Sequence, residues 1–73
     1  MDLQEIMLNA QENEDDIEKQ SFADDMACGI KLYGIDIEES DFSSCRFREC
    51  EFEKVYFKNV SFKGCDLSNI HMY

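Results

Sequence analysis

The sequence predicts an all-β solenoid, a chain that coils around a square, packed interior. One observation is that phenylalanine occupies every fifth position from Phe42 to Phe62. A five-residue step turns a helix by roughly 140° and alternates faces on a straight strand, so neither element suits the pattern. A second observation is that a small or aliphatic residue stands two positions before each ring, the same-face spacing of a strand. We therefore expect short strands joined by right-angle bends, with four strands to a coil of roughly twenty residues.

The interior of such a coil is narrow, so we interpret the aromatic ladder as a packed core rather than as an aromatic ligand site. Phe42 and Phe62, one coil apart, are expected to stack, and Phe47 is expected to lie over Leu67. The predicted core ladder consists of Phe42, Phe47, Phe52, Phe57, Phe62, Leu67, Cys45, Cys50, Val55, Val60 and Cys65.

Changes in the regularity of the pattern divide the chain into three segments. Residues 30–73 keep both the bulky and the small register and are expected to form the β-helix. Residues 17–29 keep the bulky register but carry Gln20 and Asp25 at small sites, so an irregular first turn is expected there. Residues 1–16 form an acidic N-terminal segment.

A short stretch of the N-terminal segment, residues 2–11, has helical spacing. Its apolar side chains share one helical face. These side chains are Leu3, Ile6, Met7 and Ala10. Two interpretations remain open: a frayed, partly disordered tail next to an acidic run, or a cap over the first coil, because solenoids need protected ends.

The unit "CDLSN", Cys65–Asn69, resembles the signature of the pentapeptide-repeat family: a small residue, then Asp or Asn, then Leu or Phe, then two variable residues. "CRFRE", "CEFEK", "VYFKN" and "VSFKG" are looser copies, in which Arg46, Tyr56 and Ser61 replace the usual Asp or Asn. The resemblance covers about residues 30–73. It implies a right-handed quadrilateral β-helix, which is the square coil expected above.

The net charge of −10 lies mostly in the N-terminal part of the chain. Residues 1–29 hold nine acids and one Lys, net −8, whereas residues 30–73 hold eight acids and six bases, net −2. Direct nucleic-acid binding is not expected, because phosphate contacts need clusters of Lys and Arg. The charge suits a basic partner.

No metal site is expected from the cysteines and the single histidine. Zinc ligands usually come in close pairs that converge on one point, whereas Cys45, Cys50, Cys65 and His71 do not. We interpret the three cysteines as small core residues. A disulfide between Cys45 and Cys65 is conceivable by separation, but stacked side chains point in parallel, which suits its geometry poorly. Cys28 lies outside the inward registers, where an exposed thiol is expected.

No enzymatic activity and no cofactor are expected. The chain has one His, no Gly-rich phosphate loop and no evident nucleophile–base pair, and the acids around Glu49, Glu51 and Glu53 are interpreted as a solvated surface. The acidic start has no apolar signal region, and no apolar run reaches the roughly 20 residues of a membrane span. A cytoplasmic protein with reduced thiols and no membrane association is therefore expected.

The sequence stops at "NIHMY", with Ile70 and Met72 in inward registers. We expect this end to bury itself, either in a homodimer or as part of a longer solenoid, because bare strand edges associate. Dimerisation through a C-terminal coil is also what the family resemblance implies. The candidate self-association end is Ile70, Met72 and Tyr73.

Two functions are weighed. The first is a non-catalytic protein–protein interaction module that presents the outward side chains of the β-helix. The second comes from the family resemblance, since some members mimic duplex DNA and bind DNA gyrase or topoisomerase IV, inhibiting it or protecting it from fluoroquinolones. The global charge of −10 fits the second function, but the near-neutral solenoid and its short length do not.

Overall fold

The computed structural model describes residues 2–73, so Met1, the first residue of the expected N-terminal segment, lies outside the described part. Within that part, one helix precedes ten short strands. Their bounds are α1 (Leu3–Asn13), β1 (Ile17–Glu18), β2 (Ser21–Ala23), β3 (Met26–Cys28), β4 (Lys31–Tyr33), β5 (Asp36–Glu38), β6 (Asp41–Ser43), β7 (Arg46–Arg48), β8 (Cys50–Glu53), β9 (Tyr56–Lys58) and β10 (Ile70–Met72).

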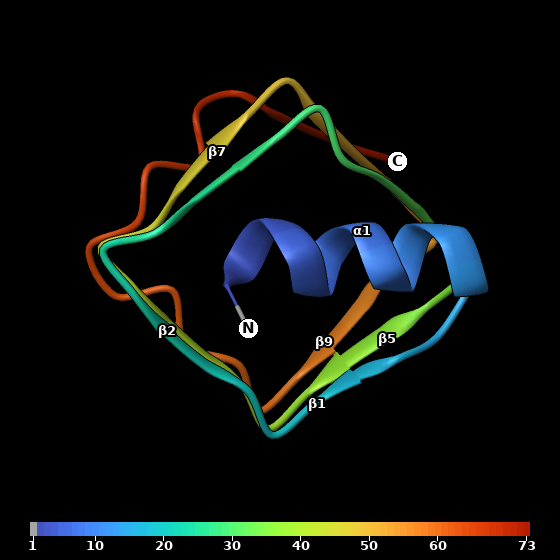
Figure 1. Ribbon diagram of the computed structural model, residues 1–73, viewed down its shortest axis with the longest axis horizontal. Coiled ribbons are helices and arrows are strands. Elements are labelled where there is room, and N and C mark those ends of the chain that lie inside the picture. The colour runs from blue at the N-terminus through green and yellow to red at the C-terminus, as the bar shows by residue number, and fades with distance from the viewer. Residues whose placement is uncertain (1) are drawn as a thin grey trace.

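The strands form a right-handed square coil, which confirms the fold class expected from the sequence. Strands β1 to β5 and β8 each pair in parallel with the strand one coil later; Ile17 is aligned with Ile37, and Ile37 with Phe57. Four sheets result: β1-β5-β9, β4-β8-β10, β2-β6 and β3-β7. Figure 1 looks down the coil from the N-terminal side, and the chain runs clockwise as it recedes from the viewer.

Each corner of the square is made by one residue in the left-handed backbone conformation. These residues recur every five positions: Lys19, Asp24, Gly29, Gly34, Glu39, Ser44, Glu49, Lys54, Asn59 and Gly64. The amide of a corner residue donates to a carbonyl of the next coil, as from Gly34 to Glu53 at 2.9 Å and from Glu39 to Lys58 at 2.9 Å. These bonds explain how non-glycine residues are held at positive φ, which costs roughly 1–2 kcal/mol each.

Aromatic rings fill the interior in a continuous stack. Phe42 lies between Phe22 and Phe62, at centroid distances of 5.3 Å and 5.1 Å, with interplanar angles of 19° and 7°. Phe47 meets Phe52 edge to face at 6.4 Å around the next corner. The stack therefore links neighbouring coils and neighbouring faces of the square.

The first coil, residues 17–29, is regular, unlike the irregular turn expected there. Its strands β1 to β3 align residue by residue with β5 to β7. The polar side chains at its small sites are used in hydrogen bonds: Gln20 Nε2 donates to the Glu18 carbonyl at 3.2 Å, and Asp25 Oδ2 accepts from Leu3 N at 2.9 Å. A terminal coil tolerates such residues because they lie next to the cap instead of under another coil.

The third coil is less regular than the sequence indicates at Leu67. This residue is 37% exposed, and its side of the coil keeps only an isolated bridge between Arg46 and Asp66. Local bonds replace the ladder there, from Cys65 N to the Phe62 carbonyl and from Ile70 N to the Leu67 carbonyl. In the described part of the chain, nothing packs on that side to hold it extended.

Candidate functional site

Helix α1 lies across the N-terminal opening of the coil (Figure 1). The side chain of Asp2 caps it by accepting from Glu5 N at 2.9 Å, and Glu14 ends it at φ 53°. Leu3, Met7 and Ala10 are buried and packed into the core below. The helix is thus an ordered part of the domain and covers the aromatic stack.

The helix also satisfies strand edges through side chains that sequence reasoning missed. Gln4 accepts from Cys28 N at 2.7 Å and donates to the Cys28 carbonyl at 3.1 Å. Gln11 accepts from Lys31 N at 2.7 Å. These amides replace the strand that a preceding coil would supply, because β3 and β4 otherwise present bare backbone groups. The available sequence signal was Asp2 followed three residues later by Glu5, which is typical of a helix start.

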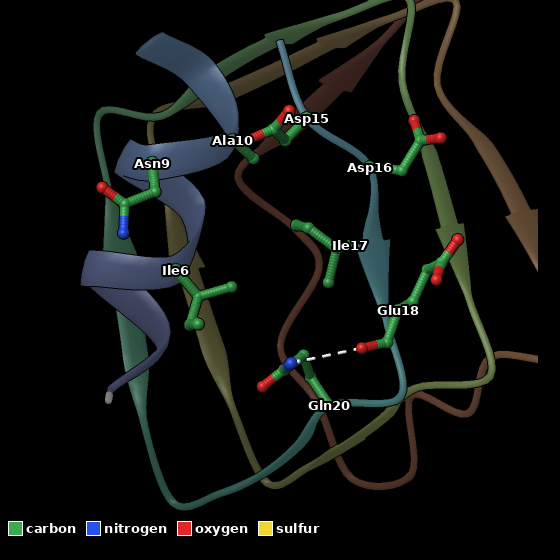
Figure 2. Close-up of a pocket in the computed structure, with 8 residues that line it drawn as sticks. All are labelled: Ile6, Asn9, Ala10, Asp15, Asp16, Ile17, Glu18 and Gln20. Atoms are coloured by element: carbon green, nitrogen blue, oxygen red, sulfur yellow. Dashed lines mark hydrogen bonds between the residues drawn. The ribbon is translucent and has the colours of Figure 1, made fainter. Parts of the chain in front are cut away.

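A cleft of about 280 Å³ remains between α1 and β1, on the side of the coil away from β3 and β4. Figure 2 shows Ile6 and Ile17 pointing into it from opposite walls, whereas the carboxylates of Asp16 and Glu18 point away. The side-chain amide of Gln20 donates to the Glu18 carbonyl at 3.2 Å, and the carboxylate of Asp16 accepts from Asp36 N at 2.8 Å. The cleft therefore has two apolar walls, at Ile6 and Ile17, within a lining that also includes the polar residues Asn9, Asp15 and Gln20.

The predicted core positions of the middle coil are buried: Phe42, Cys45, Phe47, Cys50 and Phe52. Those of the last coil are only partly buried, and these are Val55, Phe57, Val60, Phe62 and Cys65. Leu67, the remaining predicted core residue of this coil, is exposed; of the predicted self-association residues, Ile70 is half-buried and Met72 and Tyr73 are exposed. Apolar side chains thus become more exposed toward this end of the coil.

The thiols of the described chain are all free, with Cys28 exposed. Cys50 donates to the Arg48 carbonyl at 3.4 Å, and Cys65 donates to the Phe42 carbonyl at 3.1 Å. Burial raises the pKa of the Cys45 and Cys50 thiols above their ordinary value of 9.0. These two thiols are therefore protonated core groups at neutral pH, with little nucleophilic character.

Within residues 2–73, no group of three or more His, Cys, Asp or Glu side chains converges to hold a metal ion. His71 is exposed and aligned with Glu51 on the neighbouring strand. Two hydrogen bonds from Ser68 lower the pKa of the Asp66 carboxyl. The larger effect comes from the hydroxyl of Ser68, at 2.6 Å, and the smaller from its backbone amide, at 3.0 Å. That pair stabilises a local turn in the third coil.

Three tyrosines project outward near one corner of the square. Tyr33 ends β4, Tyr56 begins β9 after the next corner, and Tyr73 follows β10; they are 58%, 67% and 75% exposed. Two of them, Tyr33 and Tyr73, line a groove of about 170 Å³ together with Glu51 and Glu53. Sequence reasoning missed this groove, because the groove depends on which residue types occupy outward positions one and two coils apart.

No helix of residues 2–73 is long and apolar enough to cross a membrane. A family model described as pentapeptide repeats (9 copies) matches residues 29–72. The comparison with curated proteins and the comparison with solved structures give no match.

Proposed function

Because the chain belongs to the pentapeptide-repeat family, we propose that it is a non-catalytic module that binds another protein through outward side chains of its β-helix. The observation that carries this proposal is the group of exposed tyrosines Tyr33, Tyr56 and Tyr73. Tyrosine is enriched at protein interfaces, where it adds a large contact area at low cost in side-chain entropy. Tyr33 and Tyr56 stand on strands that are each paired with one neighbouring strand, β4 with β8 and β9 with β5.

The scaffold supports binding better than catalysis. The interior is filled by packed rings, and the described cleft and groove have volumes of about 280 and 170 Å³. The buried thiols of Cys45 and Cys50 are held protonated rather than activated. Their free state also suits a reducing compartment, so we include a cytoplasmic location in the proposal.

Capture from host lysate tests the proposed function. The immobilised chain is expected to enrich a protein that a variant carrying Tyr33→Ser, Tyr56→Ser and Tyr73→Ser does not retain. A matched control replaces exposed polar residues on other faces, with Ser43→Ala and Glu49→Gln, and is expected to keep the partner. Equal recovery with the tyrosine variant and the parent chain would count against the proposal.

We also propose that a second copy of the chain associates through the end formed by Ile70, Met72 and Tyr73. The exposed apolar side chains there support it, and so does charge. Residues 57–73 carry two Lys and one Asp, net +1, whereas residues 1–16 carry six acids, net −6. Two C-terminal ends can therefore approach without the repulsion that two N-terminal ends would meet.

Light scattering over a concentration series tests self-association. A dimer is expected at high concentration, and Met72→Lys is expected to weaken it by placing like charges at the contact. Met26→Lys, an exposed methionine of β3 on the first coil, is the matched control. A monomer at every concentration contradicts this proposal.

A second candidate function is a DNA-mimicking modulator of DNA gyrase or topoisomerase IV. The observation that favours it is the net charge of −10. The extents of 25 × 24 × 21 Å favour it less, because a mimic of duplex DNA needs an elongated acidic surface. A supercoiling assay tests this function. Inhibition or fluoroquinolone protection at micromolar protein supports it, and the absence of both effects rules it out.

A further inference from the structure

The groove between Tyr33 and Tyr73 has an aromatic wall on each side and a carboxylate between them. Tyr33 is aligned with Glu53 on the neighbouring strand. On the far side of Glu53, Tyr73 N donates to the Phe52 carbonyl at 2.9 Å, and the Tyr73 carbonyl accepts from Lys54 N at 3.1 Å. Glu53 therefore lies in one column between the two tyrosines, on three hydrogen-bonded strands.

The separation of the two tyrosines suits one flat group. They are two strand spacings apart, about 9.6 Å at the backbone. A planar group in van der Waals contact with both rings needs about 7 Å between the ring planes, since each contact is about 3.5 Å. A shift of the two rings toward each other by about 2.6 Å would let them hold a single planar group.

The charges of the groove favour a cation. Glu53 and Glu51 both line it, and Lys31 is the one basic residue among the residues that line it. Lys31 is aligned with Glu51, one strand away, so these two charges offset each other. Glu53 has no cation in its own column, because its neighbours there are the two tyrosines.

The ring of Tyr33 already attracts a cation within the chain. The ammonium nitrogen of Lys54, Nζ, lies 5.7 Å from its ring centroid. That distance is within the range in which an aromatic face attracts a positive charge. Lys54 is not among the residues that line the groove, and a guanidinium that stacks on Tyr33 would displace this ammonium or share the ring with it.

We propose that this groove binds the guanidinium group of an arginine side chain in a protein partner. The guanidinium is planar, stacks on aromatic faces and donates paired hydrogen bonds to a carboxylate, which matches two tyrosines around Glu53. An ammonium group lacks the flat faces and the paired donors. This inference rests on the proposed interaction function and names the chemistry of the residue that the partner inserts.

Titration with N-acetyl-arginine amide, followed by NMR, tests the groove without needing the partner. The ring signals of Tyr33 and Tyr73 and the amide of Glu53 are expected to shift together and to saturate, while the ring of Tyr56 stays unchanged. N-acetyl-citrulline amide, which has nearly the same shape without the charge, is expected to cause no such shifts. N-acetyl-lysine amide is expected to bind more weakly than the arginine probe.

Variants distinguish the groove from general attraction to an acidic protein. Tyr73→Ala is expected to weaken binding about two- to fivefold, the loss expected for one exposed cation–π contact, and Glu53→Gln is expected to weaken it further. Tyr56→Ala, another exposed tyrosine, is expected to leave it unchanged. Equal shifts with citrulline, unchanged binding by Tyr73→Ala, shifts confined to the acidic residues 12–16, or no binding would each overturn the inference.

The outcome is separable from that of the proposed function. Probe binding at the groove without any captured protein would uphold the site and count against the interaction module. If the Tyr73→Ala and Glu53→Gln variants retain a captured protein and the groove shows no shifts with the arginine probe, the interaction module is supported and the arginine site is overturned.

Discussion

Gln4 on helix α1 makes two hydrogen bonds to the backbone of Cys28 on β3, one to its amide at 2.7 Å and one to its carbonyl at 3.1 Å. One side-chain amide thus takes the place of a strand residue at the edge of a parallel ladder. The contact spans 24 positions of sequence and fixes the helix over the first coil.

Replacing Gln4 by Ala is expected to lower the free energy of unfolding by about 1–2 kcal/mol, because two neutral hydrogen bonds are lost. The amide of Cys28 is expected to lose protection from hydrogen exchange at the same time. Glu12→Ala changes an exposed residue on the same helix and serves as the control, with an effect within about 0.5 kcal/mol. Unchanged protection at Cys28 would contradict the assigned role of Gln4.

Phe42→Leu is expected to destabilise the domain by about 1–3 kcal/mol, since it removes two stacked ring contacts, with Phe22 and Phe62. Phe57→Leu is the matched change at a partly buried ring, and a smaller loss is expected there. Urea denaturation measures both. A larger loss of stability for Phe57→Leu than for Phe42→Leu would contradict the assignment of the middle coil as the centre of the core.

Two corner substitutions are expected to act in opposite directions. Gly34→Ala places a side chain at φ +65° and is expected to cost about 1–2 kcal/mol through strain alone, since nothing lies within 4 Å of the added carbon. Ser44 lies at φ 53°, so Ser44→Gly relieves such strain. The relief exceeds the conformational-entropy cost of Gly, about 0.5–1 kcal/mol, so the stability of the folded chain is expected to rise slightly. Thermal unfolding of both variants checks the signs, and a loss for Ser44→Gly would contradict this account.

Stability is expected to fall in alkaline solution through the thiols of Cys45 and Cys50. Burial raises the pKa of both groups in the folded chain above 9.0, so their contribution is fully present below pH 9.0 and is lost as the pH rises through their raised values. The variant with Cys45→Ala and Cys50→Ala is expected to lose less stability over the same pH interval. Parallel pH curves for the two proteins would show that the thiols do not contribute.

The sequence was sufficient for the coil because the bulky residues, Phe42 to Phe62, recur at a spacing that only a bending strand accommodates. It was not sufficient for the corners, where residues as different as Lys19, Glu39 and Gly64 share one backbone conformation. Hydrogen bonds from the neighbouring coil impose that conformation, so local preference does not report it. Nor could the pattern reveal why Asp25 is tolerated in the first coil, since its partner is the backbone of the helix.

The groove between Tyr33 and Tyr73 was not predicted, for a different reason. The expected coil of twenty residues places Tyr33, Glu53 and Tyr73 in one outward column, but the apolar pattern that predicts the coil gives no signal at outward positions. Each of these residues alone is an ordinary exposed side chain. The fold class therefore follows from the spacing of apolar residues, whereas the groove follows from the lateral alignment of polar ones.

The position of α1 across a single opening gives the molecule a direction. A bare end of a parallel coil is a template onto which strands of another chain could add. Gln4 and Gln11 of the helix occupy part of that template, at Cys28 and Lys31 of the first coil, and so hinder the addition of strands there. In the dimer proposed above, two copies joined at their C-terminal ends would carry a helix at each outer tip, which would hinder lengthening into a fibre.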